Sequence, residues 1–214
     1  MARGTVLVTG GTVRIGAAIA AELRSRGWRV LVSSHRADAG ADIVADLSEP
    51  SGAVRLYAEA LAKAPDLCAV VNNAALFRGD AAVLEAVNFT APQKLTMLLA
   101  GREGVECSVV NVLDARLLDS SAAADASAYA GTKRRLLDYT RKAACLFADS
   151  LRVNAVAPGP VLAPEGCHEP AGEMLLGRRP SPADVAAAVA YLLEAAPVTG
   201  VVIPVDSGQH LLMA

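Results

Sequence analysis

The chain has 214 residues, of which 53% are hydrophobic and 20% charged, and its formal net charge is −2. These values predict one folded domain with a sizeable core, and they exclude a disordered chain or one that binds nucleic acid through a basic surface. No apolar run is long enough to cross a bilayer and no secretion signal precedes the first apolar run, so we expect a cytoplasmic protein.

Four cysteines lie far apart in the sequence, at Cys68, Cys107, Cys145 and Cys167. Their spacing contains no CxxC pair, and two of them fall within apolar runs. We therefore expect reduced, buried thiols, with a disulfide pair as the alternative, and no metal site.

Short apolar runs alternate with amphipathic segments along nearly the whole chain. The apolar runs are continuous and rich in valine, which is typical of strands buried on both faces in a parallel sheet. The repeated alternation predicts an α/β fold, a single Rossmann-type domain with a doubly wound parallel sheet of about seven strands and helices on both faces. The expected strands are 5–8, 29–33, 42–45, 68–72, 107–112, 152–157 and 201–205, and the expected helices are 15–26, 54–64, 87–99, 127–147 and 182–194.

A glycine turn joins the first expected strand to the first expected helix, in the sequence Thr-Val-Leu-Val-Thr-Gly-Gly-Thr-Val-Arg-Ile-Gly. A parallel strand that passes to a helix in this way often holds a phosphate at the helix N-terminus. Gly10 and Gly11 permit close approach to an anion, and Gly16 permits close helix–strand packing. Arg14 would place a permanent cation beside the pyrophosphate. A purely structural corner is the alternative.

The second expected strand ends in Ser34, His35 and Arg36, without the carboxylate that would bind a ribose 2′-hydroxyl. Small hydroxyls followed by a guanidinium suit a 2′-phosphate better, which favours NADP over NAD. Asp46 and Leu47 follow the third strand, where they would meet the adenine; a turn-forming Asp is the alternative.

Tyr129 and Lys133 lie four positions apart on an expected helix, so their side chains share one face. An ammonium close to a phenol lowers the phenol pKa, and such a phenol can give a proton to a substrate as hydride arrives. Asn73 and Asn88 follow the fourth strand and Asp114 follows the fifth, at the sheet edge where ligands bind. Satisfying loop backbone groups is the alternative role for the two asparagines, and a turn-forming Asp is the alternative for Asp114.

These motifs, in this order and spacing, resemble the short-chain dehydrogenase/reductase family over essentially the whole chain. They are Thr9-Gly10-(x)5-Gly16, Asn72-Asn73-Ala74, Asn88, Tyr129-(x)3-Lys133 and Pro158-Gly159. Within that family, four details resemble the pteridine and dihydromonapterin reductases. They are Arg14 in the glycine turn, His35-Arg36 at the 2′-phosphate, Phe77 four residues after Asn73, and Asp114 where most members carry a catalytic serine.

The resemblance implies NADPH-dependent reduction of a pterin-like C=N bond. Asp114 and Tyr129 would handle protons, Lys133 would hold the nicotinamide ribose, Asn88 would support a relay through Lys133, and Phe77 would stack on the pterin. The implied cofactor contacts are Gly10, Arg14, Ile15, Gly16, Ser34, His35, Arg36, Asp46, Leu47, Asn73, Ala74, Lys133, Pro158 and Gly159.

The chain also departs from this pattern. Asp114 and Tyr129 are separated by fifteen positions, more than the usual gap, and Ala75 replaces a serine of the pteridine reductases. Two alternatives therefore stay open: a carbonyl reductase of the 3-oxoacyl-thioester type, and a sensor that binds NADPH without chemistry. A carboxylate at position 114 speaks against the carbonyl reductase, because polarising a carbonyl calls for a neutral donor.

Two further expectations concern assembly and a loop. The helices 87–99 and 127–147 carry broad apolar faces which, with the family resemblance, lead us to expect a homo-oligomer, a tetramer or a dimer. We expect the substrate to be a small molecule, either a pterin or a carbonyl compound. The segment 159–181 follows a strand directly and has little pattern, and we expect it to form a lid over the ligand crevice, with a surface loop as the alternative.

Overall fold

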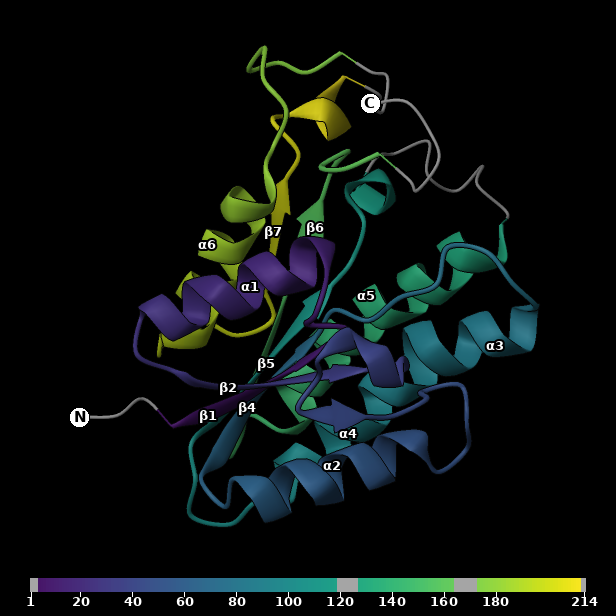
Figure 1. The fold of residues 1–214 in the computed structure, drawn as a ribbon. Coiled ribbons are helices and arrows are strands. Elements are labelled where there is room, and N and C mark those ends of the chain that lie inside the picture. The colour runs from purple at the N-terminus through teal and green to yellow at the C-terminus, as the bar shows by residue number, and fades with distance from the viewer. Residues whose placement is uncertain (1–3, 119–126, 164–172, 213–214) are drawn as a thin grey trace.

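The computed structural model describes residues 4–118, 127–163 and 173–212, and its centre is a parallel sheet of seven strands in the order β3-β2-β1-β4-β5-β6-β7 (Figure 1). The strand order reverses between β1 and β4, which are hydrogen-bonded neighbours. In doubly wound sheets, ligands bind at the carboxyl ends of the strands beside this reversal. The strands are β1 Thr5–Thr9, β2 Arg29–Ser34, β3 Ile43–Val44, β4 Leu67–Asn72, β5 Cys107–Val112, β6 Leu151–Pro158 and β7 Val202–Val205.

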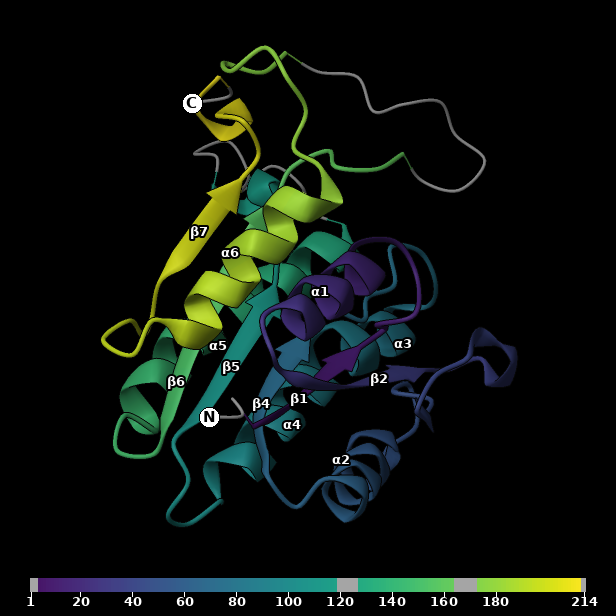
Figure 2. The ribbon, with the colours of Figure 1, turned by 60° about the vertical axis from the view of Figure 1, so that its left-hand side comes forward.

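Helices cover both faces of the sheet. Figure 2 shows α1 and α6 side by side over one face, and α2, α4 and α5 cover the other. The helices are α1 Arg14–Ser25, α2 Gly52–Lys63, α3 Ala81–Glu85, α4 Ala91–Ala100, α5 Ala128–Leu146 and α6 Pro182–Glu194. Short 3-10 turns cover Ala37–Ala39 (η1), Ala115–Leu118 (η3) and Gln209–Leu211 (η5). The expected doubly wound parallel fold is confirmed.

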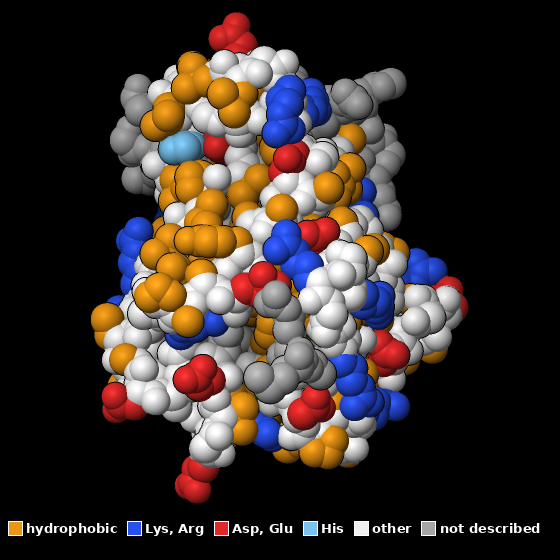
Figure 3. All heavy atoms as spheres, turned by 90° about the vertical axis from the view of Figure 1, so that its left-hand side faces the viewer, with side chains coloured by type: hydrophobic (Ala, Val, Ile, Leu, Met, Phe, Trp, Pro, Cys, Tyr) orange, Lys and Arg blue, Asp and Glu red, His pale blue; other side chains and the backbone are white. Residues whose placement is uncertain are grey.

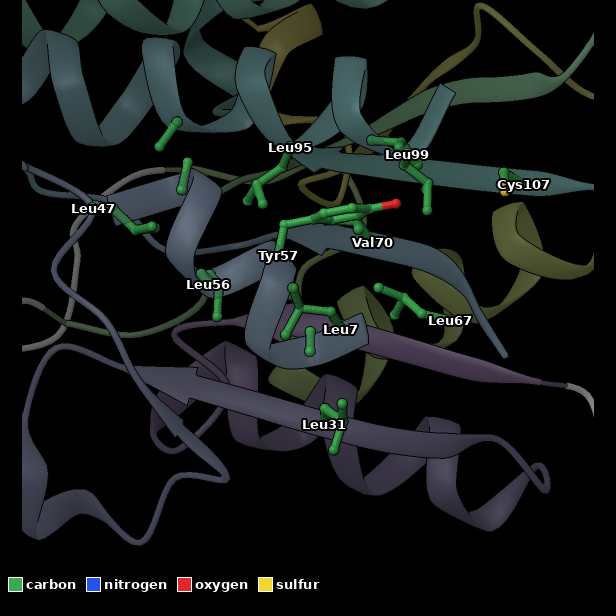
Figure 4. Packing of buried hydrophobic residues seen from close by; sticks show 14 of the residues in the cluster. Leu7, Leu31, Leu47, Leu56, Tyr57, Leu67, Val70, Leu95, Leu99 and Cys107 are labelled. Carbon is green, nitrogen blue, oxygen red and sulfur yellow. The ribbon is translucent and has the colours of Figure 1, made fainter. Parts of the chain in front are cut away.

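The strands bury both of their faces, as their continuous apolar runs predict. Along β1, Leu7 points to the α2–α4 side, whereas Val6 and Val8 point to the α1–α6 side, and all three are fully buried. On the α2–α4 side, Figure 4 shows the Tyr57 ring between Leu95 and the strands. These two cores fix the strands, and with them the edge at which the candidate site lies.

The helix expected at 87–99 is one correction to the sequence reading. Helical structure begins earlier, at Ala81, and runs through α3, a π-helical turn at Ala86–Thr90 (η2) and α4. The amide of Ala91 bonds to the carbonyl of Ala86, five residues back, instead of the usual four. This wider turn lets Pro92, which has no amide hydrogen, lie inside a continuous helical run. Periodicity alone does not reveal a π turn.

The cysteine expectation is partly wrong. Cys68, Cys107 and Cys145 are free thiols, but Cys145 is exposed on α5 and Cys68 is half-buried. Cys145 lies near the C-terminal end of α5, next to Leu146, whose side chain also faces solvent. Cys167, together with positions 164–172 of the expected lid, lies outside the described residues. Among the described residues, no helix is both long enough and apolar enough to span a bilayer.

Candidate active site

A glycine corner joins β1 to α1 at the carboxyl edge of the sheet. Gly10 has a φ of 61°, a value that favours glycine. A Cβ on Gly16 would lie 2.1 Å from the carbonyl oxygen of Gly10, so α1 approaches the corner as closely as glycine allows. Asn73 donates from Nδ2 to the carbonyls of Thr9 and Gly10, both at 3.0 Å.

Thr9 is the second residue that shapes this corner, and its role was not expected from the sequence. Its Oγ1 accepts hydrogen bonds from the amides of Asn73 and Ala74, each at 3.0 Å. The ends of β1 and β4 are therefore tied together on both sides. Asn73 and Ala74 therefore stabilise the glycine corner through hydrogen bonds to Thr9 and Gly10.

The first turn of α1 is open to an anion. Its N-cap residue, Val13, makes no side-chain capping bond, and no acidic residue lies in the turn. Uncapped amides and the helix dipole favour negative charge at this place. Arg14 begins the helix with a φ of 53°, and its Nη2 donates to the carbonyl of Ala163 at 2.7 Å. Arg14 thus links the corner to the segment that follows β6, and Ile15 packs against the α1–α6 core.

At the end of β2, Arg36 is exposed and lies beside a carboxylate. Its Nε and Nη2 donate to the two carboxylate oxygens of Asp38, at 3.1 and 2.9 Å, and its amide donates to Ser34 Oγ at 3.1 Å. The Arg36 guanidinium holds the pKa of the Asp38 carboxyl below its ordinary value. His35 is exposed next to this pair. An anion that binds Arg36 has to compete with Asp38.

Asp46 and Leu47 have local partners in the structure. One oxygen of Asp46 accepts from the amide and the hydroxyl of Ser48, at 2.8 and 2.7 Å, and these bonds lower the pKa of the Asp46 carboxyl. Leu47 is buried in the core between α2 and the sheet. Asp46 therefore also fits the turn-forming alternative.

The structure brings Tyr129, Lys133 and Asp114 together, although Asp114 is fifteen positions from Tyr129 in the sequence. Ser127 caps α5 by accepting from the amide of Ala130, which places Tyr129 in the first turn of the helix. The Tyr129 hydroxyl donates to Asp114 Oδ2 at 3.2 Å. Lys133 is 2% exposed, and its Nζ donates to the carbonyl of Val112, the last residue of β5, at 2.7 Å.

The electrostatics of this group differ from the sequence expectation. Burial and the neighbouring Asp114 carboxylate raise the pKa of the Tyr129 phenol above its ordinary value, whereas we expected Lys133 to lower it. Burial disfavours the charged phenolate, and the Asp114 carboxylate accepts the phenol hydrogen directly, whereas the ammonium lies 6.0 Å from the ring centroid. Burial lowers the pKa of Lys133 to about 8.

Arg116 is a member of the site that the sequence reading missed. Its Nε and Nη2 donate to Oδ1 and Oδ2 of Asp114, at 3.1 and 2.8 Å. Its guanidinium carbon lies 5.7 Å from the ring centroid of Phe77 and 5.9 Å from that of Tyr129. The two rings meet edge to face, with centroids 4.9 Å apart. The sequence did offer a signal for this pair, because Arg116 follows Asp114 by two residues and a side chain there can reach back to a turn aspartate.

Asn88 lies in the π turn and acts on the loop after β4. Its side-chain amide accepts from the amide of Leu76 and donates to the carbonyl of Leu76, both at 2.8 Å, and it contacts Thr132 Oγ1 at 3.3 Å. It therefore fixes the backbone just before Phe77. These contacts attach the loop to α5 one residue before Lys133.

Pro158 and Gly159 close the site at the end of β6. A Cβ on Gly159 would lie 2.6 Å from that of Asp206, and Asp206 is buried against His210, at 2.7 Å between Oδ2 and Nδ1. Asp206 and His210 line a cavity of about 320 Å³ beside β7. The structure thus places the sequence-predicted residues along one edge of the sheet, with Leu47 directed into the core.

Comparison with known proteins agrees with this geometry. A family model described as enoyl-(acyl carrier protein) reductase matches residues 12–210. The putative ketoacyl reductase 2 of the granaticin polyketide synthase, from Streptomyces violaceoruber, is 32% identical, over 96% of each chain. The chain belongs to the short-chain dehydrogenase/reductase family. This is a family of oxidoreductases.

Two other family members are similar over nearly their whole length. The dihydromonapterin reductase of Citrobacter koseri is 28% identical, over 96% of each chain. The solved structure of FolM alternative dihydrofolate reductase 1 from Brucella canis, complexed with NADP, superposes with a TM-score of 0.83 at 29% identity. The match covers 98% of this chain and 95% of that chain. Both matches thus cover at least 95% of each chain.

Proposed function

We propose that this chain uses NADPH to reduce a C=N bond of a pterin-type ring. The observation that carries the proposal is the contact between the Tyr129 hydroxyl and the Asp114 carboxylate at the end of β5. An ionised carboxylate only accepts hydrogen bonds, so it suits a ring that presents N–H and amino donors. The same group is poorly suited to stabilise an oxyanion that forms from a carbonyl.

The residues at the other end of the site fit an NADP cofactor. The uncapped first turn of α1 and the closely packed glycines suit a pyrophosphate. Arg36, with Ser34 beside it, offers a cation and a hydroxyl to a 2′-phosphate. Lys133 would hold the nicotinamide ribose through its ammonium. When bound, NADPH supplies the hydride.

The proton reaches the substrate from Tyr129. Its raised pKa keeps the phenol protonated at neutral pH, so the phenol can donate to the ring nitrogen while the neighbouring carbon is reduced. The phenolate that forms recovers a proton from Lys133 or from solvent. Phe77 offers a flat, half-exposed surface beside Tyr129, and Asn88 holds the backbone before it.

The names of two relatives support this substrate class. One is called a dihydromonapterin reductase and the other an alternative dihydrofolate reductase that was solved with NADP. The test is NADPH oxidation followed with dihydromonapterin, dihydrobiopterin and dihydrofolate as substrates. The Tyr129→Phe variant should still bind NADPH but lose at least about 100-fold in turnover. Absence of turnover with all three pterins would contradict the proposal, and NADPH binding without any turnover would favour a sensor.

Carbonyl reduction is the second candidate. The relative that is 32% identical is named a putative ketoacyl reductase, and a protonated Tyr129 is also a suitable donor to a carbonyl oxygen. The Asp114→Ser variant separates the two candidates, because serine is a neutral donor. For a pterin reductase, this change should lower pterin turnover by about 100-fold and leave NADPH binding unchanged. A gain of turnover on a 3-oxoacyl thioester without any loss on pterins would favour carbonyl reduction.

We also propose that the protein forms a homo-oligomer. Met97 on α4 and Leu146 on α5 are exposed apolar residues on the helices for which we expected it. Apolar side chains also gather on the face that carries α6 and β7 (Figure 3), where Tyr191 and Leu176 are exposed. Sedimentation at micromolar concentration should give a dimer or a tetramer, and a monomer mass would contradict the proposal.

A further inference from the structure

Among the residues that the structure describes, four hydrogen-bond donors surround the carboxylate of Asp114, and three of them belong to Arg116. Oδ1 accepts from the amide of Arg116 at 3.0 Å and from its Nε at 3.1 Å. Oδ2 accepts from Nη2 of Arg116 at 2.8 Å and from the Tyr129 hydroxyl at 3.2 Å. A carboxylate has about four lone-pair sites, so this one is saturated within the protein. Any ligand that is to bind Asp114 must displace one of these donors.

The Arg116 side chain is the donor that can leave. It is 49% exposed, whereas the Asp114 side chain is 16% exposed. The backbone amide of Arg116 holds Asp114 independently of the guanidinium, and so does the Tyr129 hydroxyl until it gives its hydrogen to the substrate. Asp114 therefore keeps its place and Arg116 moves aside, because exchange of a half-exposed ion pair requires little free energy.

The guanidinium of Arg116 presents the same pair of N–H donors as one edge of a pterin-type ring. It is planar and presents two parallel N–H groups, from Nε and Nη2, to the two carboxylate oxygens. A 2-aminopyrimidin-4-one ring presents a ring N–H and an amino N–H side by side in the same way. The guanidinium also lies near the Phe77 and Tyr129 rings, where a flat heterocycle would be placed beside Asp114.

We propose that Arg116 is a specificity-determining residue, an internal competitor that occupies the ligand-binding edge of Asp114. Only a planar ligand with two adjacent N–H donors recovers both bonds that are lost when Arg116 leaves. Ligands with one donor or none recover fewer bonds and are disfavoured. This inference rests on the proposed function, which places a pterin-type ring beside Asp114. It adds that the ring binds through the edge that carries the ring N–H and the amino group.

The test is the Arg116→Met variant, which keeps the apolar stem but removes the donors. Binding of 2-aminopyrimidin-4-one to the NADPH-loaded protein is measured by calorimetry, with pyrimidine, which has no N–H donor and therefore does not displace Arg116, as the comparison ligand. We expect the amino ligand to bind about three- to tenfold more tightly to the variant than to the parent protein, and the comparison ligand to change by less than twofold. The double variant Arg116→Met/Asp114→Asn should lose this gain, because the amide no longer accepts both donors.

Arg135 provides a matched control. It pairs with Glu85 at 2.7 Å and lies 4.3 Å from the ring centroid of Phe89, so it makes a comparable ion pair and ring contact with other partners. The Arg135→Met variant should bind both ligands as the parent protein does. Equal, weaker or unmeasurable binding of the amino ligand to Arg116→Met would overturn the inference, and so would an equal gain for both ligands.

A positioning role for Arg116 predicts different kinetics. If Arg116 served to orient Asp114, its removal would lower kcat and leave KM unchanged; as a competitor, its removal should lower the KM of a dihydropterin by a larger factor than any change in kcat. The two proposals can fail separately. Absence of pterin turnover in the parent protein contradicts the proposed function, whereas the change in ligand binding on removal of Arg116 decides the inference.

Discussion

The glycine corner and the Asp114 cluster lie on the same edge of the sheet but are built differently. The corner consists of backbone groups and two short side chains: Asn73 and Thr9 bond the ends of β1 and β4 directly to each other. The cluster consists of side chains that meet in space, and both Phe77 and Arg116 are about half exposed. The corner therefore tolerates no added atom, whereas the cluster can exchange partners.

The largest effect should come from adding one methyl group to the corner. In Gly16→Ala, the new Cβ would lie 2.1 Å from the Gly10 carbonyl oxygen, so α1 must move away from β1. We expect the free energy of unfolding to fall by about 3 kcal/mol and NADPH binding to weaken at least about tenfold. Chemical denaturation and NADPH fluorescence measure the two quantities.

Gly101→Ala is the matched control for that variant. Gly101 ends α4 with a φ of −75°, and a Cβ there would meet its nearest atom at an ordinary 3.5 Å. Its free energy of unfolding should stay equal or rise by about 0.5 kcal/mol, since alanine restricts the unfolded chain. If Gly16→Ala changed the free energy of unfolding as little as Gly101→Ala, the corner could accommodate a Cβ, and this prediction would be contradicted.

The buried ammonium of Lys133 should give the next largest effect, on stability as a function of pH. Its pKa is about 8 in the folded protein and 10.5 as an ordinary lysine. Between these values the unfolded chain binds the additional proton, so the stability of the parent protein rises with pH there. Between pH 8 and pH 10.5, the free energy of unfolding of the parent protein should rise by on the order of 3 kcal/mol relative to that of Lys133→Met.

Denaturation of both proteins across that pH range checks the prediction. Below pH 8 the difference in their free energies of unfolding should be constant, because both folded and unfolded lysine are then charged. A constant difference up to pH 10.5 would mean that Lys133 titrates normally despite its burial.

The smallest effect should come from the exposed pair at the end of β2. Arg36→Ala should weaken NADPH binding about tenfold and leave NADH binding nearly unchanged, because only NADPH carries the 2′-phosphate. Asp38→Asn removes the carboxylate that competes for Arg36 and should strengthen NADPH binding about twofold at low salt. Equal effects on NADPH and NADH would show that Arg36 does not contact a 2′-phosphate.

Local features of the sequence predicted much of this edge. The valine-rich runs gave the strands to within about two residues, and the glycine turn and the Tyr129–Lys133 spacing follow directly from backbone periods. The onset of helix at Ala81 was missed, since α3 has five residues, too few to show a helical period. The predicted direction of the Tyr129 pKa shift was wrong, because helical spacing identified the ammonium but revealed neither the burial of the phenol nor its bond to the Asp114 carboxylate.

The sequence by itself determined the parallel sheet, the corner and the shared face of Tyr129 and Lys133, because strand and helix periods and glycine conformations are local properties. Only the tertiary structure decided that Asp114 reaches Tyr129 across fifteen positions and that Asn88 holds the loop before Phe77. These contacts join different elements, so they depend on how the helices and strands pack and on which way each side chain turns, and no local pattern encodes either.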